Sequence, residues 1–102
     1  MKEQTTLAEA RIEITHDVGL HARPSVKLTK LAKGFDSRIA LALAEDGPWI
    51  DAKSIVKVMA TKAPKGSMLY LRAEGEDADD AIEALVELVR RDFDEGEPNV
   101  DA

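Results

Sequence analysis

The sequence switches repeatedly between two apolar periodicities, and this switching constrains the fold more than any other feature. Alternating apolar and polar residues, helped in one case by a preceding EDGP turn, predict strands at residues 10–16, 37–44, 49–51 and 68–73. Apolar residues spaced three or four apart predict amphipathic helices at residues 22–33, 53–60 and 78–91. Gly34 is expected to end the first helix in a left-handed conformation, and Asp77 is expected to cap the start of the last one. The predicted order is therefore β-α-β-β-α-β-α.

This order packs most economically as an α+β open-faced sandwich, in which a four-stranded antiparallel sheet carries three helices on one face. We expect one domain over residues 9–93. Residues 1–8 have no apolar period and are predicted to be a flexible N-terminus. Residues 94–102 are predicted to be a disordered acidic tail, because they bury too little apolar surface to offset their ordering entropy.

The composition of the 102 residues excludes several classes of function. There is no cysteine, so disulfide frameworks, thiolate metal sites and cysteine nucleophiles are excluded. A formal charge of −6 argues against binding to nucleic acid or to an anionic membrane surface, which both need excess Lys and Arg. No apolar run approaches the ~18 residues that span a bilayer, and the first residues lack the apolar stretch of a signal peptide. We therefore expect a cytoplasmic protein.

The charge is distributed unevenly along the chain. Residues 21–65 carry nine basic and four acidic residues, a net +5, whereas residues 66–102 carry three basic and twelve acidic residues, a net −9. Two interpretations remain open. The mixed charges only keep a small domain soluble, or the basic part of the surface docks acidic protein partners.

The segment Gly19–Pro24 (GLHARP) places a histidine where a loop becomes a helix. Backbone amides at a helix N-terminus have no intrahelical acceptor, and together with the positive end of the helix dipole they form an anion site. The amides of Ala22 and Arg23 could bind a phosphoryl group on His21, and the Arg23 guanidinium suits phosphate oxygens. The same field favours the neutral, nucleophilic imidazole. The alternative is that His21 only caps the helix or faces solvent.

The GLHARP segment resembles the active-site signature of the HPr family, the histidine-containing phosphocarriers of the phosphoenolpyruvate-dependent phosphotransferase system. Further segments resemble that family in the same order within residues 11–93: KLAKGF (30–35), DAKSIV (51–56) and AEGED (73–77). The resemblance implies the open-faced sandwich, with His21 phosphorylated on Nδ1 by enzyme I and the phosphoryl group then passed to an enzyme IIA-type acceptor. It implies a substrate of enzymes rather than an enzyme, with no cofactor of its own.

Ser54 matches, by segment, the serine that a dedicated kinase, the HPr kinase/phosphorylase, modifies in many Gram-positive members of the family. A phosphate there would add negative charge beside the docking surface and weaken the binding of acidic partners. The alternative is that the hydroxyl only caps the short helix that follows.

In the family fold, basic residues on and around the first two helices would flank His21 and form the rim of a docking patch. The apolar centre of the patch would come from the short helix, although some of its apolar residues are expected in the core. The predicted docking residues are Lys27, Lys30, Lys33, Lys53, Ile55, Val56, Lys57 and Met59. An apolar centre with a charged rim is typical of a transient interface.

Two features depart from the best-known family members. Val18 precedes Gly19 where many members have a short polar residue, and the hairpin between Leu43 and Ser54 is about two residues longer. They leave the pathway open between sugar uptake and a regulatory module of a nitrogen-related or dihydroxyacetone-kinase pathway, whose phosphorylation state controls its partners. We expect a monomer. His16 is not expected to hold a metal, because the chain has no cysteine and only two histidines.

Overall fold

Four strands form one antiparallel sheet in the order β1-β4-β2-β3 in the computed structural model, which describes residues 6–17 and 19–94. The strands are β1 (Leu7–Glu13), β2 (Arg38–Ala42), β3 (Ile50–Asp51) and β4 (Met68–Glu74). Strand β4 lies between β1 and β2 and pairs along its whole length with β1, from Leu7 opposite Glu74 to Glu13 opposite Met68. The central position of β4 explains its fully buried alternate residues, Leu69, Leu71 and Ala73.

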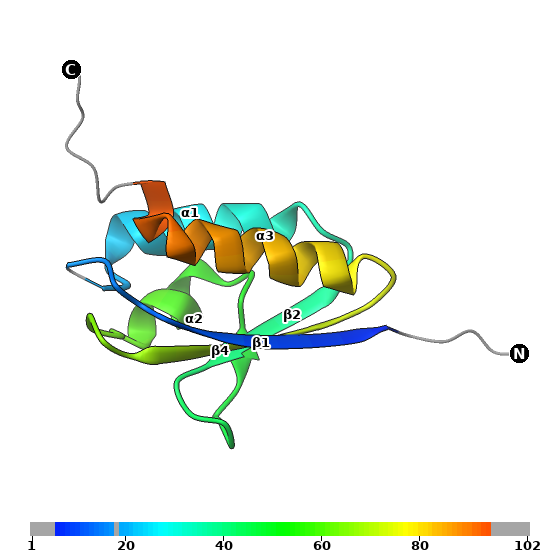
Figure 1. Ribbon diagram of the computed structural model, residues 1–102, viewed down its shortest axis with the longest axis horizontal. Helices are drawn as coiled ribbons and strands as arrows, with labels where there is room; N and C mark the ends of the chain where they lie inside the picture. Colours follow the sequence, from blue (N-terminus) through cyan, green and yellow to red (C-terminus); the bar gives the residue numbers. More distant parts are fainter. Residues whose placement is uncertain (1–5, 18, 95–102) are drawn as a thin grey trace, which may run out of the picture.

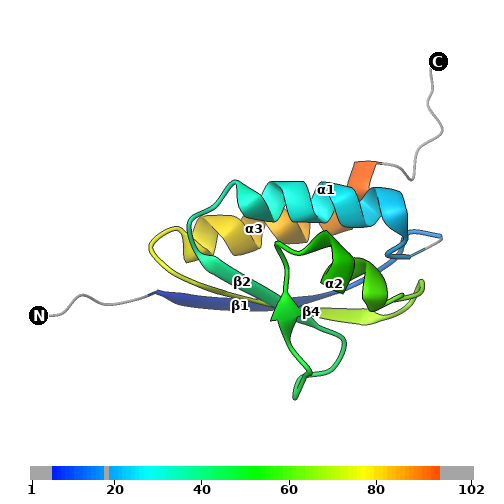
Figure 2. The same cartoon turned by 180° about the vertical axis from the view of Figure 1, so that it is seen from behind.

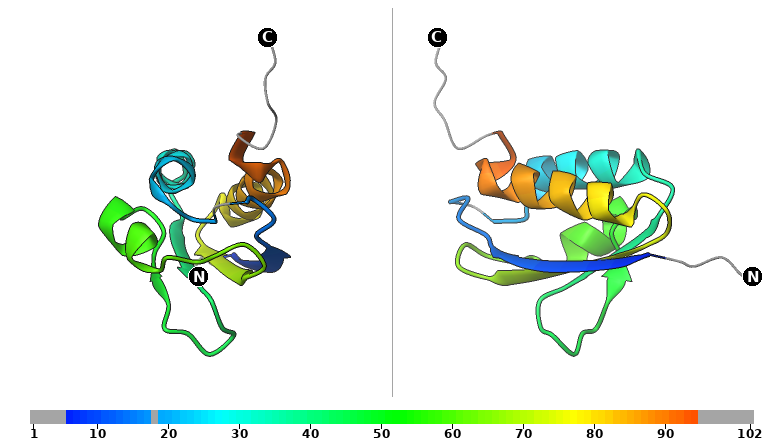
Figure 3. Two further views of the ribbon diagram at one scale, coloured as in Figure 1. Left: turned by 90° about the vertical axis from the view of Figure 1, so that its left-hand side faces the viewer. Right: turned by 45° about the vertical axis from the view of Figure 1, so that its right-hand side comes forward.

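Three helices cover one face of this sheet, as Figures 1 and 2 show. They are α1 (Ala22–Lys33), α2 (Ile55–Ala60) and α3 (Ala78–Arg90). Helices α1 and α3 lie side by side over the strands, and α2 packs against α1 (Figure 3). The α+β open-faced sandwich and the order β-α-β-β-α-β-α are therefore confirmed.

The core lies between the helices and the sheet. Leu28 and Ala32 of α1 and Leu85 of α3 are fully buried there, at the spacing that the amphipathic pattern predicts. Each fully buried leucine contributes on the order of 1.5–3 kcal/mol relative to an exposed one. This core fixes the orientation of α1, and with it the position of the residue that precedes the helix.

A short 3-10 turn, η1 (Asp92–Asp94), follows α3 and brings the chain back beside α1. Figure 1 shows it in orange-red near the start of α1. Phe93 in this turn is completely buried and belongs to the core. Asp94, predicted to begin a disordered tail, is the last residue of the turn, and residues 95–102 lie outside the described part of the chain.

Several element boundaries differ from the prediction. Strand β1 begins at Leu7, inside the segment predicted to be flexible, because its backbone pairs with β4 even though the Leu7 side chain is exposed. Strand β2 ends at Ala42, so that Leu43 leaves the alternation and is exposed. Residues 1–5 and Val18 lie outside the described residues.

The C-terminus of α1 also corrects an expectation. Gly34 was expected to end the helix in a left-handed conformation, but its φ of −76° is right-handed. The amides of Gly34 and Phe35 donate to the carbonyls of Leu31 and Ala32, at 3.0 and 3.1 Å, so the helix ends by tightening into 3-10-type bonds. Within residues 6–17 and 19–94, no helix has the length and apolar character needed to cross a membrane.

Candidate functional site

The loop before α1 is anchored by a glycine in the left-handed region. Gly19 has φ +66°, and a Cβ at this position would lie 2.2 Å from the backbone oxygen of Ala63. The next amide, that of Leu20, donates to the same oxygen at 2.8 Å. Only glycine fits such a close approach without displacing the neighbouring loop. The backbone immediately before the helix is therefore fixed against a second segment.

His21 occupies the N-cap position of α1, and its side chain is exposed. Its backbone oxygen accepts the first bond of the helix, from the amide of Ser25 at 3.0 Å. The imidazole makes no capping hydrogen bond. The His21 side chain therefore does not cap the helix, which was one of the two alternatives to a phosphoryl site. The ring faces solvent beside the amino end of the helix.

The first turn of α1 suits an anion. The first hydrogen bond of the helix runs from the Ser25 amide to the His21 backbone oxygen, and Pro24 has no N–H. The amides of Ala22 and Arg23 come before this bond, so the helix itself provides no acceptor for them. The first turn contains no acidic residue, while Lys30 lies in the last turn. The positive end of the helix dipole is thus not offset by a carboxylate of the helix's own first turn.

Two aromatic side chains that were not predicted to act at this site lie near it: His16 is beside His21, and Phe93 is beside His16. The ring centroids of His16 and His21 are 5.8 Å apart with an interplanar angle of 44°. The Phe93 ring meets the other imidazole, that of His16, edge-on at 6.0 Å and 72°. No cluster of three or more metal-ligating side chains occurs in the described ranges. The sequence offers one signal for Phe93, because it is an aromatic residue within an acidic stretch.

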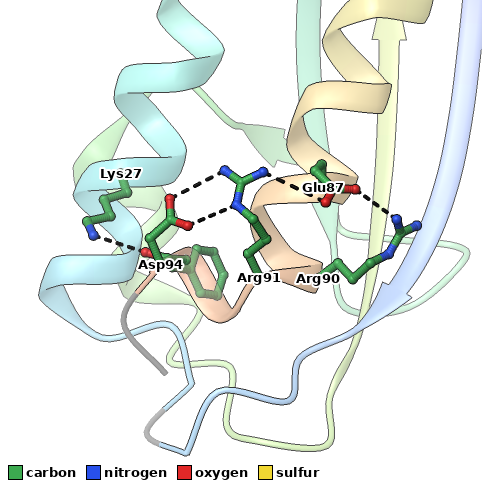
Figure 4. A network of polar contacts seen from close by, with 6 residues as sticks. Lys27, Glu87, Arg90, Arg91 and Asp94 are labelled. Carbon is green, nitrogen blue, oxygen red and sulfur yellow. Dashed lines mark hydrogen bonds and ion pairs between the residues drawn. The ribbon is translucent and has the colours of Figure 1, made fainter. Parts of the chain in front are cut away.

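Polar contacts link η1 to helices α1 and α3 (Figure 4). The Lys27 ammonium of α1 donates to the backbone oxygen of Phe93 at 3.0 Å. The Arg91 guanidinium donates to both carboxylate oxygens of Asp94, at 2.8 and 3.3 Å, and lies 3.8 Å from Glu87. The hydrogen bond from Arg91 lowers the pKa of Asp94 below its usual 3.8. Figure 4 shows Lys27 and Arg91 reaching the turn from opposite sides.

The predicted docking residues divide into those near His21 and those far from it. Arg23, Lys27 and Lys30 follow one another at positions i, i+4 and i+7, on one face of α1. Lys33 ends the helix, about 18 Å along the axis from His21 at 1.5 Å per residue. Lys53 lies at that same far end, because its ammonium donates to the Phe35 backbone oxygen at 2.7 Å. Lys33 and Lys53 therefore lie at the end of α1 away from His21, and their role in docking stays a prediction.

Helix α2 exposes part of its apolar surface. Val56 is 74% exposed and Met59 39%, while Ile55 is half-buried and Lys57 is exposed. Val26 of the adjacent α1, which was not predicted as a docking residue, is also exposed at 46%. The periodicity of α1 gave no signal for Val26, because it lies off the apolar stripe of that helix. Exposed apolar side chains on two packed helices are typical of a docking patch.

Ser54 is the N-cap of α2. Its hydroxyl oxygen accepts a hydrogen bond from the Lys57 amide at 3.3 Å. The predicted capping role is therefore confirmed. It satisfies one of the amides that a short helix leaves without an internal acceptor.

One surface hollow lies away from His21. It has a volume of about 870 Å³ and is lined by Arg38, Trp49 and Arg72 among others, with no residue from the start of α1. The Arg72 guanidinium covers the Trp49 ring at 4.0 Å. His21 itself is exposed, so another protein can reach its side chain.

Comparisons with known proteins agree with this geometry. Residues 8–91 match the family model described as the HPr component phosphorylation site of the PTS. The phosphocarrier protein HPr of Pseudomonas putida is 42% identical over 86 residues, which cover 84% of this chain and 94% of that protein. The phosphocarrier protein NPr of Escherichia coli K12 is 33% identical, covering 82% of this chain and 92% of its own.

The fold is equally similar to a solved structure. The crystal structure of HPr-C-His from Thermoanaerobacter tengcongensis superimposes with a TM-score of 0.79 at 39% sequence identity. The similarity covers 86% of this chain and 97% of that one. The loop that carries His21 lies within residues 8–91, which the family model matches.

Proposed function

The chain belongs to the HPr family of phosphocarrier proteins, and from this premise we propose that His21 is the residue that carries the phosphoryl group. A member of this family accepts a phosphoryl group from phosphoenolpyruvate through enzyme I and passes it to an enzyme IIA-type acceptor. The protein is therefore a substrate of the phosphotransferase system rather than a catalyst. The family assigns the activity, and the assignment of residues rests on the site described above.

The observation that supports His21 is its position. Its exposed ring makes no capping bond and lies beside amides that precede the first acceptor of α1. The other histidine, His16, is only 7% exposed and is not accessible to a partner protein. A phosphoryl group on His21 would be within reach of the amides of Ala22 and Arg23, and the Arg23 guanidinium would share its charge.

The transfer step balances without any added group. A lone pair on one ring nitrogen of neutral His21 attacks the phosphorus of the phosphohistidine on enzyme I. The phosphorus–nitrogen bond of the donor breaks as the new one forms. The opposite nitrogen of His21 gives up its proton, and the released donor imidazole takes a proton. The family resemblance assigns the attack to Nδ1. The protein's own amides and guanidinium bind the transferred oxygens, and transfer to the acceptor reverses these roles.

We assign the docking surface to the faces of α1 and α2 nearest His21. Its apolar centre consists of Val26, Val56 and Met59, which are exposed, and its rim includes Lys30 and Lys57. Both enzyme I and the IIA-type acceptor would use this surface in turn, because each must reach the same ring. An apolar centre with a charged rim suits a short-lived complex.

Incubation with enzyme I and phosphoenolpyruvate tests the assignment of His21. The wild type should gain one acid-labile phosphate by mass spectrometry, and His21→Ala should gain none while melting at the same temperature, because an exposed residue contributes little to the core. Glu83→Ala, an exposed change on α3, is the matched control and should label normally. An acid-labile phosphate in His21→Ala would overturn the assignment.

The likeness to NPr favours a second candidate function. In that case the phosphorylation state of His21 would control the binding of a regulatory target instead of serving only sugar uptake. Pull-down of target proteins with the phosphorylated wild type and with His21→Ala distinguishes the two. A regulator binds its target differently in the two states and keeps its phosphate, whereas a carrier loses the phosphate to an IIA-type acceptor.

Ser54, the oligomeric state and the compartment are separate parts of the proposal. The Ser54 hydroxyl already caps α2, which supports a structural role, and a kinase-dependent role predicts an acid-stable phosphate on Ser54 in cells. We expect a monomer in the cytoplasm, because its partners are proteins of the phosphotransferase system and its exposed apolar side chains form a small patch. Light scattering and cell fractionation measure these directly.

A further inference from the structure

We propose that His16 is a positioning residue that orients the His21 ring, so that one chosen ring nitrogen faces the phosphoryl donor. The turn η1 holds His16 in place through Phe93. This inference rests on the proposed role of His21 and adds to it the regioselectivity of phosphorylation. Neither His16 nor Phe93 contacts the partner in this proposal, since both are buried.

An exposed imidazole presents one particular nitrogen to a phosphoryl donor only if a neighbouring group restricts the rotation of its ring. The His21 side chain makes no capping bond to its own helix, so the backbone does not fix its ring. The His16 ring lies 5.8 Å from it, centroid to centroid, and is itself only 7% exposed. The backbone oxygen of His16 accepts from the amide of Gly19 at 3.0 Å, within the same tight loop. Loop and ring therefore limit the rotation of His21 together.

Phe93 supports His16 from the other side. Its ring is completely buried and meets His16 in the edge-on arrangement that aromatic pairs favour. Phe93 is distant in sequence but belongs to the same core cluster as Leu20, which immediately precedes His21. The order Phe93, His16, His21 thus runs from the core to the surface.

The backbone of η1, which positions Phe93 against His16, is strained. Asp92, Phe93 and Asp94 have φ of 53°, 57° and 60°, three consecutive residues in the left-handed region. Such a run is unfavourable for residues other than glycine. It persists because contacts on both sides fix it: the Thr15 hydroxyl donates to Asp92, Lys27 to the Phe93 backbone oxygen, and Arg91 to Asp94. Strain of this kind is maintained where the surrounding structure over-determines it.

The consequence concerns which nitrogen is phosphorylated. A histidine ring that rotates freely offers both Nδ1 and Nε2 to a donor, whereas a ring held against a wall offers one. Removal of the His16 ring should therefore change the product as well as the rate. A purely structural role for His16 would change neither the position of the phosphate nor its dependence on an aromatic ring.

Phosphoramidate is the donor that isolates this effect, because it is small and needs no docking surface. The bond between its phosphorus and its nitrogen breaks as the bond to His21 forms, and ammonia leaves with the proton from the opposite ring nitrogen as ammonium. ¹⁵N and ³¹P NMR of the full chain distinguish Nδ1 from Nε2 phosphohistidine. The wild type should give one isomer.

His16→Ala should give a mixture of both isomers, formed roughly tenfold more slowly because a freely rotating ring is seldom in the reactive orientation. His16→Phe restores an aromatic wall and should restore the single isomer. Phe93→Leu, which keeps an apolar side chain in the core, should give an intermediate mixture and covers the case in which His16→Ala does not fold.

Three outcomes are decisive. A single isomer in both His16→Ala and Phe93→Leu overturns the positioning role, and so does a mixture in His16→Phe as large as that in His16→Ala. An absence of phosphate on His21 in the wild type would instead overturn the proposed function, together with this inference.

Discussion

Helices α1 and α3 begin in opposite ways, although both lie on the same face of the sheet. The first turn of α1 contains no acidic residue, and the His21 side chain at its N-cap binds no backbone amide. The first turn of α3 contains Asp79 and Asp80, and its N-cap is Asp77. Acidic residues are stabilising at a helix N-terminus, so α3 follows the usual rule and α1 does not.

The carboxylate of Asp77 also corrects a sequence-based expectation. It does not cap α3 by a side-chain bond, as predicted, but accepts hydrogen bonds from the amides of Asp36 and Ser37, both at 2.9 Å, and from the Ser37 hydroxyl. The Ser37 hydroxyl is the largest cause of a lowered pKa for Asp77. The start of α3 thus fixes the connection between α1 and β2.

The difference fits the proposed role of His21 as the residue that carries the phosphoryl group. A carboxylate resident in the first turn of α1 would stabilise the helix but would repel a phosphoryl group that arrives and leaves. At the start of α3 the Asp77 carboxylate accepts hydrogen bonds from Asp36 and Ser37, so a permanent carboxylate serves the fold. Stability and function therefore favour opposite residues at the same helical position, and variants that exchange these residues separate the two.

The largest effect is expected when α1 receives the kind of residue that α3 has. Ala22→Asp should slow phosphoryl transfer from enzyme I at least ~100-fold, because a carboxylate beside a phosphoryl dianion costs several kcal/mol. The melting temperature should stay the same or rise, because an acidic residue in the first turn is favourable by roughly 0.3–1 kcal/mol. Rapid-quench transfer assays and calorimetry measure the two. Ala22→Asn, a neutral side chain of similar size, should transfer nearly normally, and equal losses in both variants would refute the electrostatic explanation.

A smaller effect on the rate of phosphoryl transfer is expected when the first turn of α1 loses the positive charge of Arg23. Arg23→Ala should slow transfer roughly 10- to 100-fold, as expected for one charge-assisted contact of about 1.5–3 kcal/mol. Arg23→Lys keeps the positive charge but lacks the planar guanidinium, so its transfer rate should lie between those of wild type and Arg23→Ala. Single-turnover assays at subsaturating donor provide the rates. A wild-type rate in Arg23→Ala would mean that the backbone amides suffice.

The sequence predicted the start of α1 and missed what surrounds it, for a physical reason. Gly19 and Pro24 carry local signals, since one permits a left-handed turn and the other is tolerated only in a first helical turn, so His21 could be placed at the N-cap. The contact of Phe93 with His16 joins residues far apart in the chain, and only tertiary packing creates it. No local pattern predicts three successive left-handed residues.

The same contrast explains the mixed outcome for charged residues. Composition predicted a basic middle segment, and Lys30 and Lys57 are exposed as expected. Lys27 donates to the backbone oxygen of Phe93, and Lys53 donates to that of Phe35. Both contacts join parts of the chain whose proximity could not be predicted from the sequence. Asp77 was recognised as an N-cap from its position, but its partners lie on another connection. Local position was predictable, and the choice of partner was not.

Removal of the resident carboxylate of α3 should affect stability and leave transfer intact. Asp77→Ala should lower the melting temperature at pH 7 by several degrees, because the amide and hydroxyl of the buried Ser37 lose their acceptor. Since the pKa of Asp77 is lower in the folded chain than its usual 3.8, the ionised carboxylate stabilises the fold above that value. The stabilisation is lost as the pH falls through the folded pKa.

The difference in melting temperature between wild type and Asp77→Ala should therefore be constant from pH 7 to about 5 and shrink below about 4. Thermal melts across this range measure it. Asp80→Ala, an exposed change in the same turn, is the control and should have a smaller effect at pH 7. A difference that persists unchanged at pH 3 would show that the carboxylate charge does not contribute.

The smallest effect is expected from charges on α1 beyond its first turn, which steer partners but do not touch the phosphoryl group. Rim charges act mainly on the association rate, and their attraction is screened over a Debye length of about 8 Å at physiological salt. Lys30→Glu should slow transfer only a few-fold at about 0.02 M salt, and the difference from wild type should vanish near 0.3 M. Lys33→Glu makes the same charge change at the far end of the helix and should have less effect. A stopped-flow salt series on the three proteins decides this, because equal slowing by Lys30→Glu and Lys33→Glu would mean that net charge, and not a docking face beside His21, attracts the partner.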